Sequence, residues 1–178
     1  MILVIAEHNN KKLKSFTLNA IQASSQIGDD INVLVMGNNC DSVIEEVRNI
    51  PIVKKVLKAK SEIYENHLVE DTTPLIVRLA EDYTHILASA TAFGKNLMPR
   101  VAALLDVSQI SDITKIENND TFVRPIYAGN VISTVKSNDN KKIITIRPTS
   151  FEPALTSGGS AEVEDIELTD SSNLSIFV

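Results

Sequence analysis

Short, mostly apolar runs are the feature that most constrains the fold of this chain. Three of them are clear, at residues 2–6, 31–36 and 85–89, and a less regular fourth lies at residues 53–57. An unbroken apolar run of four to eight residues is typical of a strand that is buried on both faces. Segments with helical spacing separate the runs. This alternation predicts an α/β fold, in which a mainly parallel sheet is covered by helices on both faces.

Helical patterns fill the segments between these runs. The first pattern has its apolar residues on one face, at Phe16, Ala20, Ala23 and Ile27. A later helix is expected to begin with Thr73 as its N-cap and Pro74 at its first position. Another is expected to begin with Asn96 as its cap, with Pro99 in its first turn, and to bury Leu97, Val101 and Leu104. Each helix can then cover the sheet with one apolar stripe.

The second half of the chain has a different rhythm. Four short β-rich runs lie at residues 113–117, 121–127, 131–135 and 143–147, separated by turn clusters rich in Asn, Asp and Gly. We expect them to form a small antiparallel β extension, from about residue 107, that packs on the α/β body because it is too small to bury a core of its own. The chain is therefore divided into residues 1–150, an α/β domain with this extension, and residues 151–178, a linker or extended acidic tail.

Composition excludes several function classes. The net charge is −6, and six of the 23 acidic residues but none of the 17 basic residues lie after Ser150, so there is no basic stripe for a nucleic acid. Cys40 is the only cysteine, which rules out an internal disulfide and any multi-cysteine metal site. The N-terminal apolar run is too short to span a bilayer, so direct membrane insertion is not expected.

Few residues stand out as candidate sites. The turn after the run at residues 85–89 could hold an anion through Gly94, Lys95 and Asn96, because it opens a helix. The turn has neither P-loop spacing nor a three-glycine fingerprint, and a structural role for Gly94 and Asn96 is the preferred interpretation. The three histidines, His8, His67 and His85, have no partner at ligand spacing, so no metal site is expected. No catalytic residue is proposed.

The segment from Arg124 to Asn130 is the candidate partner interface. We expect Arg124 and Tyr127 to alternate with Val123 and Ile126 on opposite faces of a strand, so that one face can meet a partner. Tyrosine and arginine are the side chains that contribute most at protein interfaces. Both also occur as ordinary rim residues, so Arg124, Tyr127 and Asn130 are candidates for a partner surface at this point. A separate stretch, residues 156–160, is interpreted as a flexible hinge, with phosphate binding as the alternative.

Four stretches carry a resemblance to a known family. They read Leu-Val-Ile-Ala-Glu-His (3–8), Ser-Ala-Thr-Ala-Phe-Gly-Lys-Asn-Leu-Met-Pro-Arg-Val-Ala-Ala (89–103), Thr-Phe-Val-Arg-Pro-Ile-Tyr-Ala-Gly-Asn (121–130) and Thr-Ser-Gly-Gly-Ser (156–160). With Thr-Ser-Phe at 149–151, they resemble the N-terminal domain of the α subunit of electron transfer flavoprotein. The resemblance covers the chain to about Ser160. It implies an adenine-nucleotide α-hydrolase-like fold, similar to that of the partner β subunit, which is the subunit that holds AMP.

The resemblance also implies a function. Such a subunit is an electron carrier and not an enzyme: the heterodimer takes electrons from acyl-CoA and other flavin dehydrogenases and passes them to a membrane-bound quinone oxidoreductase. The FAD is held by a C-terminal domain that is absent from this sequence, so no cofactor is expected here. This domain serves as scaffold and partner surface, and the resemblance implies that the segment from Arg124 to Asn130 contacts either the β subunit or that C-terminal domain. The location would be cytoplasmic in a bacterium, which a start at Met1 favours, or the mitochondrial matrix in a eukaryote.

Two other functions remain open at this point. One is a free-standing adenine-nucleotide-binding α/β protein that uses the strand ends at residues 6–8 and 37–39, where open parallel sheets place their ligands. Neither strand end has a glycine-rich phosphate loop. The other is a structural subunit that has lost electron transfer.

Overall fold

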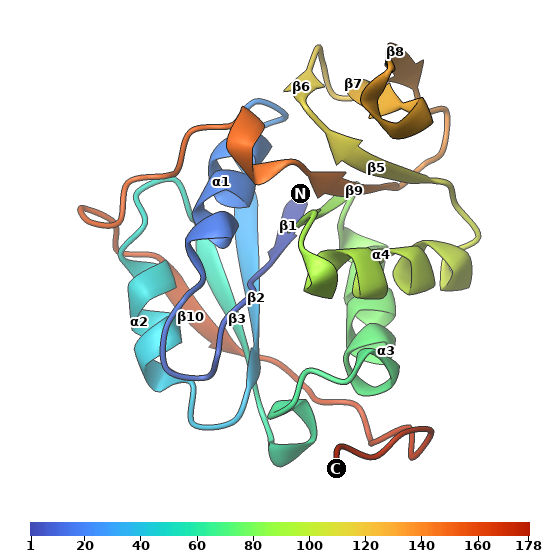
Figure 1. The fold of residues 1–178 in the computed structure, drawn as a ribbon. Helices are drawn as coiled ribbons and strands as arrows, with labels where there is room; N and C mark the ends of the chain where they lie inside the picture. The colour runs from blue at the N-terminus through green and yellow to red at the C-terminus, as the bar shows by residue number, and fades with distance from the viewer.

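A seven-stranded sheet forms the centre of the molecule in the computed structural model, which describes residues 1–178 (Figure 1). The strand order is β10-β3-β2-β1-β4-β9-β5. The strands are β1 (Ile2–Ile5), β2 (Ile31–Gly37), β3 (Lys55–Lys60), β4 (His85–Ser89), β5 (Gln109–Ile113), β9 (Lys142–Ile146) and β10 (Glu162–Asp165). Every pairing between neighbours in this sheet is parallel. The predicted α/β fold with a mainly parallel sheet is confirmed.

Helices cover both faces of this sheet (Figure 1). They are α1 (Ser15–Ser24), α2 (Asp41–Arg48), α3 (Val69–Leu79) and α4 (Ala92–Leu104). The side chains of β1 alternate between the two sides: Ile2 and Val4 pack in the cluster that includes α1 and α2, and Leu3 and Ile5 pack in the cluster that includes α3 and α4. Strand β1 therefore serves two cores, which is why it contains no polar residue.

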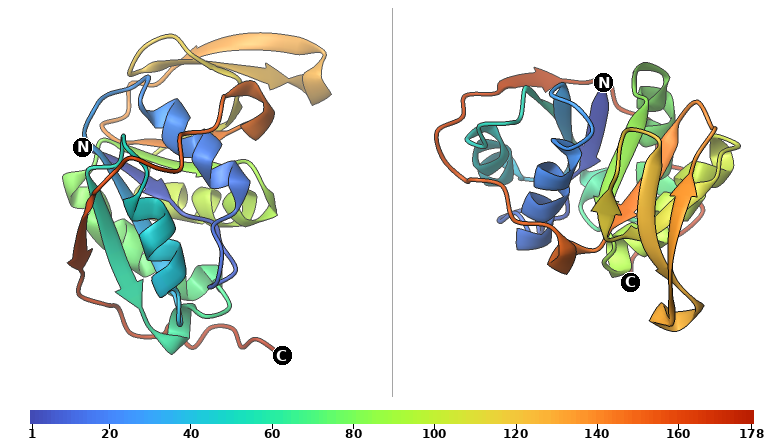
Figure 2. Two further views of the ribbon diagram at one scale, coloured as in Figure 1. Left: turned by 90° about the vertical axis from the view of Figure 1, so that its left-hand side faces the viewer. Right: turned by 90° about the horizontal axis from the view of Figure 1, so that it is seen from above.

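A small antiparallel sheet projects beyond β5 (Figure 2). It consists of β6 (Lys115–Ile116), β7 (Thr121–Ile126) and β8 (Val131–Lys136), and the short helical turn η3 (Tyr127–Gly129) joins β7 to β8. We call residues 115–136 the arm. Phe122 is fully buried and packs with Ile113 and Ile116 in the α1/α2 core cluster, which anchors the arm to the body. The predicted antiparallel extension is confirmed for these strands.

The run at residues 143–147 was expected to belong to this extension, and that expectation is wrong. Residues Lys142–Ile146 form β9, which lies inside the main sheet, parallel to β4 on one side and to β5 on the other. Ile143 to Ile146 are all buried, as are all residues of β1, β2 and β4. The arm is therefore an insertion between two strands of the main sheet, β5 and β9.

Two helices begin earlier than expected. Helix α3 begins at Val69, so Thr73 is not its cap and Pro74 lies inside it. Helix α4 begins at Ala92 and is capped by Thr91, whose hydroxyl accepts a hydrogen bond from the Gly94 amide. Asn96 and Pro99 accordingly lie within α4. The apolar faces were also partly misassigned, since Phe16 and Leu104 are exposed.

The C-terminal segment crosses the molecule and adds the edge strand β10 beside β3. Residues 156–160, interpreted as a flexible hinge, run past the end of α2, where the amide of Gly159 donates to the carbonyl of Asn49 at 2.9 Å. A side chain on Gly159 would meet the backbone of Ile50, so only glycine fits this approach. The acidic residues of β10 pair with lysines of β3: Lys55 with Glu164 at 2.6 Å and Lys58 with Asp165 at 2.7 Å.

Candidate functional site

The tip of the arm presents exposed side chains on an unusual backbone. Tyr127 is 75% exposed and Ile132 is 64% exposed. Tyr127, Ala128 and Gly129 are three consecutive residues in left-handed conformations, with φ of 49°, 55° and 92°. A non-glycine residue in this region costs about 1–3 kcal/mol, and such residues gather at sites where the conformation serves recognition. These features make the tip a candidate partner surface.

Arg124 and Tyr127 do not share one face of the arm, contrary to expectation. Residues two apart on a strand lie on the same side, so Arg124 faces the body with the buried Phe122 and with Ile126. Arg124 lines a cavity of about 340 Å³ between β5, β7 and the loop after β8. Its Nε atom is buried and has no hydrogen-bond partner. Within the chain this donor is unsatisfied, whereas Tyr127 and Asn130 lie exposed at the tip.

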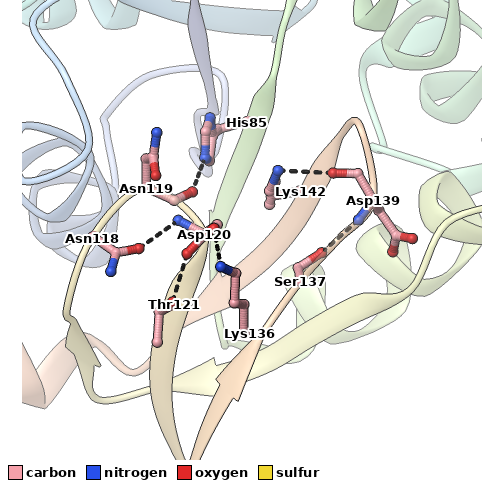
Figure 3. Close-up of polar contacts among 9 residues, drawn as sticks. All are labelled: His85, Asn118, Asn119, Asp120, Thr121, Lys136, Ser137, Asp139 and Lys142. Carbon is pink, nitrogen blue, oxygen red and sulfur yellow. Dashed lines mark hydrogen bonds and ion pairs between the residues drawn. The ribbon is translucent and has the colours of Figure 1, made fainter.

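Polar contacts hold one side of the arm's base to the sheet (Figure 3). His85 Nε2 lies 2.6 Å from the carbonyl oxygen of Asn119, in the turn between β6 and β7. In the same turn the carboxylate of Asp120 pairs with Lys136 of β8 at 3.2 Å, and the amide of Ser137 donates to the Asp120 carbonyl at 2.8 Å. This side of the base is thus bonded both to the main sheet and across the arm.

The loop after β8 supplies the other side of the base. A carboxylate oxygen of Asp139 accepts a hydrogen bond from the Ser108 amide at 2.9 Å. Lys142 Nζ donates to the Asp139 carbonyl at 2.8 Å (Figure 3). The arm is therefore fixed where it leaves the body, while its tip carries no comparable contact to the rest of the chain.

The predicted anion site lies at the beginning of α4. Gly94 is buried there, and Lys95 and Asn96 are exposed, without side-chain hydrogen bonds or ion pairs. The Thr91 hydroxyl at this helix end donates to Glu7 Oε2 at 2.6 Å. A carboxylate of the chain itself thus lies beside the cap of this helix. The anion site at Gly94, Lys95 and Asn96 stays a prediction.

A small cavity lies where the sheet changes direction, at the carboxyl end of β1. Strands β2 and β3 lie to one side of β1 and β4 and β9 to the other, which is the position where parallel sheets place ligands. The cavity measures about 140 Å³ and is lined by Glu7, His8, His67 and Phe93. The rings of His8 and His67 are 4.7 Å apart in an edge-to-face arrangement. Sequence reasoning missed this pair, because 59 positions separate the two histidines and no local pattern joins them.

Hydrogen bonds define the protonation of the two histidines. His8 Nδ1 accepts from the amide of Asn10 at 3.0 Å, so the proton of the neutral ring is on Nε2, which is buried and has no partner. His67 Nε2 donates to the carbonyl of Met36 at 3.0 Å. Burial, and then the neighbouring His67, lower the pKa of His8 to about 4. Burial likewise lowers the pKa of His67. Both rings are therefore neutral at pH 7.

The loops around this cavity do not fit FAD or a nucleotide. Asn10 occupies the space beside Gly37, where its side-chain oxygen accepts from the amide of Asn38 at 3.1 Å. A phosphate would need that amide and that space. The cavity is also smaller than the roughly 300 Å³ at which pockets for ordinary organic ligands begin. The strand ends of this chain therefore give no support to nucleotide binding.

No cluster of three or more His, Cys, Asp or Glu residues has the arrangement of a metal site. Cys40 is buried in the α1/α2 core cluster, and burial raises the pKa of its thiol, so it is protonated at neutral pH. No helix is both long enough and apolar enough to cross a membrane.

Comparisons with known proteins agree along nearly the whole chain. A family model described as an electron transfer flavoprotein domain matches residues 2–171. The electron transfer flavoprotein subunit alpha of Pseudomonas aeruginosa is 50% identical over 177 residues, which cover 99% of this chain and 57% of that protein. The mitochondrial subunit alpha of Dictyostelium discoideum is 50% identical over 169 residues, or 90% of this chain and 48% of that protein. The subunit alpha of Paracoccus denitrificans is 46% identical over 178 residues, with coverages of 99% and 57%. This chain spans about half the length of these relatives.

Proposed function

The chain belongs to the electron transfer flavoprotein domain family, and on this basis we propose that it is the N-terminal domain of an α subunit, where it acts as scaffold and partner-binding surface. The relatives that it matches are named as α subunits, and the match covers about half of each. We propose further that the assembled protein pairs this subunit with a β subunit. The pair would carry electrons from acyl-CoA and other flavin dehydrogenases to a membrane-bound quinone oxidoreductase.

FAD supplies the one- or two-electron chemistry of such a carrier when it is bound. The residues of this chain do not fit it, since the cavity at the strand ends is small and Asn10 fills the adjoining loop. We therefore propose that the flavin is held outside this domain and that the domain itself is an electron carrier component without catalytic residues. The location would be the cytoplasm in a bacterium or the mitochondrial matrix in a eukaryote. The relatives include a bacterial protein and a mitochondrial one.

The observation that carries the partner-binding role is the arm. Its base is bonded to the main sheet, whereas its tip exposes Tyr127 in a left-handed conformation, followed by the exposed Asn130. Arg124 adds a guanidinium whose Nε has no acceptor within the chain. A backbone strained at an exposed tip and an unsatisfied buried donor both lower stability, so a role outside the isolated chain accounts for them better than folding does.

Association of the subunits tests this proposal. In an α subunit containing this domain, Arg124→Ala should weaken binding of the β subunit by about 1–3 kcal/mol, as loss of an interface anchor does, and leave the melting temperature of the isolated domain nearly unchanged. Arg48→Ala is the matched control, because Arg48 is exposed on α2 and bonds only Glu45. If Arg124→Ala lowers the stability of the isolated domain and leaves association untouched, Arg124 is an internal structural residue and the interface assignment is wrong.

A further inference from the structure

His85 connects the main sheet to the arm (Figure 3). It is the first residue of β4, its side chain is buried, and its Nε2 atom reaches the carbonyl of Asn119 in the turn between β6 and β7. We infer that His85 is a positioning residue that fixes the direction in which the arm presents its tip to the partner subunit. This inference rests on the proposed function, in which the tip is the partner surface.

The bond from His85 is held at both ends. A carbonyl oxygen only accepts, so the ring donates from Nε2 to Asn119, and its Nδ1 is an acceptor 2.9 Å from the hydroxyl of Thr84. That hydroxyl also lies 3.2 Å from the carbonyl of Met1 and has one proton for these two acceptors. Thr84 is itself bonded through its amide to the carbonyl of Met1 at 3.0 Å. The imidazole is therefore oriented by the sheet before it meets the arm. Rotation of the ring away from Asn119 would leave the Nε2 donor of the buried His85 side chain without a partner.

The remaining contacts at the base do not replace this one. Asp139 is bonded to Ser108 and Lys142, but it lies in the loop after β8, on the other side of the base. Phe122 anchors the middle of β7 through apolar packing, which is not directional. His85 supplies the directional bond to the turn before β7. Without it the arm keeps the contacts of the loop after β8 and the bond from the Thr114 amide to the Val123 carbonyl at 2.8 Å, but nothing holds the turn at Asn119 to the main sheet, so the arm can tilt.

A small tilt at the base has a large effect at the tip. Six residues of strand separate the turn at Asn119 from Tyr127, which is a length of about 20 Å at 3.3 Å per residue. A tilt of about 10° at Asn119 moves the far end of a strand of this length, at Tyr127, by about 3.5 Å. That displacement exceeds the tolerance of a hydrogen bond, so a partner would have to reorder the arm on binding.

The experiment compares variants of an α subunit containing this domain for binding to its β subunit. His85→Ala should weaken association about tenfold, because the arm must be reordered on binding. His85→Gln, whose side-chain N–H can still donate to the Asn119 carbonyl, should restore most of the affinity. Asn32→Ala is the matched control: Asn32 is buried on β2, bonds Tyr83 at 2.8 Å and does not touch the arm, so it should lower stability without a comparable change in affinity.

Amide hydrogen exchange on the isolated chain gives a second, independent readout. His85→Ala should speed exchange in β7 and β8 while leaving β1 and β2 protected, whereas Asn32→Ala should not act on the arm selectively. If His85→Ala and Asn32→Ala lower stability equally and neither changes association or exchange in the arm, His85 is only a structural residue and the inference fails. If the wild-type subunit does not bind its partner through the arm but exchange in the arm still depends on His85, the proposed function fails and the positioning of the arm stands.

Discussion

Gly94→Ala should destabilise the domain strongly, because Gly94 lies against the end of β4. The methyl carbon of an alanine at this position would lie much closer than 3.0 Å to the carbonyl oxygen of Ser89, its nearest neighbour. Real Cβ atoms essentially never approach another heavy atom within 3.0 Å. The carbonyl carbon of Ser89 would lie 3.1 Å away. Both are backbone atoms, so no side chain can rotate to make room. Either α4 or the end of β4 must move.

The end of β4 resists that movement. Ser89 is in register with Ile146 of β9, the amide of Ala90 donates to the Ile146 carbonyl at 2.7 Å, and the Ser89 hydroxyl donates to the Phe16 carbonyl at 2.6 Å. Overpacking of a core costs about 1–3 kcal/mol, and a clash with fixed backbone belongs at the upper end, so we expect a loss of about 3 kcal/mol. At about 2–4 °C per kcal/mol for a domain of this size, the melting temperature should fall by about 6–12 °C.

Thermal and urea unfolding of the purified chain measure this effect. Gly28→Ala is the control, because its Cβ would meet only Ile2 Cδ1 at an ordinary 3.5 Å. It should stay within about 0.5 kcal/mol of the original chain, as changes without a structural conflict do. If Gly94→Ala is as stable as Gly28→Ala, the close approach between α4 and β4 does not constrain position 94, and the reasoning fails.

Three further predictions concern pH, the C-terminal segment and the cofactor. The pKa of His8 is lowered from 6.5 to about 4, so the unfolded chain takes up the proton first as the pH falls. The free energy of unfolding should therefore decrease by at most about 3 kcal/mol between about pH 6.5 and about pH 4. Urea unfolding of His8→Gln should show a weaker pH dependence than the original chain, and an unchanged dependence would contradict the assignment. Limited proteolysis should release the segment after Pro153 before it cuts the body up to about Ser150. Release should be faster in the double variant Lys55→Ala, Lys58→Ala, which loses two ion pairs to β10. Equal protection of body and tail would count against a boundary between residues 150 and 153. The purified chain should show no flavin absorption band after gel filtration, and a stoichiometric band would refute the proposal that FAD is held elsewhere.

The main sheet could be predicted because its strands are encoded locally. The run at residues 85–89 coincides with β4, and residues 31–36 lie within β2. The same signal was present at residues 143–146, since Ile-Ile-Thr-Ile carries almost no polar side chain, but the neighbouring turn clusters suggested a hairpin. The error came from reading residues 143–147 together with the turns before them. An apolar run alone indicates burial on both faces, and β9 follows that rule.

Other features depend on contacts that no local pattern records. Thr91 caps α4 in place of Asn96, and both residue types are good caps, so only the packing of Gly94 on β4 decides between them. The acidic tail appeared to have no basic partner within its own segment. Its partners are Lys55 and Lys58 on β3, about a hundred residues earlier in the chain.

For the candidate partner surface, the element that carries the residues was predictable and the geometry of that element was not; their role stays a prediction. Arg124, Tyr127 and Asn130 do lie on the arm, as their turn and strand pattern indicated. The left-handed backbone at Tyr127 and Ala128 could not be foreseen, because neither residue favours it. The bond from His85 to Asn119 joins the main sheet to a turn 34 positions later and likewise left no sequence signal.

The most direct test of the account is a hydrogen-exchange footprint of this domain within the assembled protein. Exchange is compared between an α subunit containing the chain, alone and bound to its β subunit. The account predicts that the amides of the arm from Arg124 to Val131 become protected on binding, while the exposed face of α2 does not change. Unaltered exchange across the arm in a complex that has formed would contradict the claim that this domain meets its partner there.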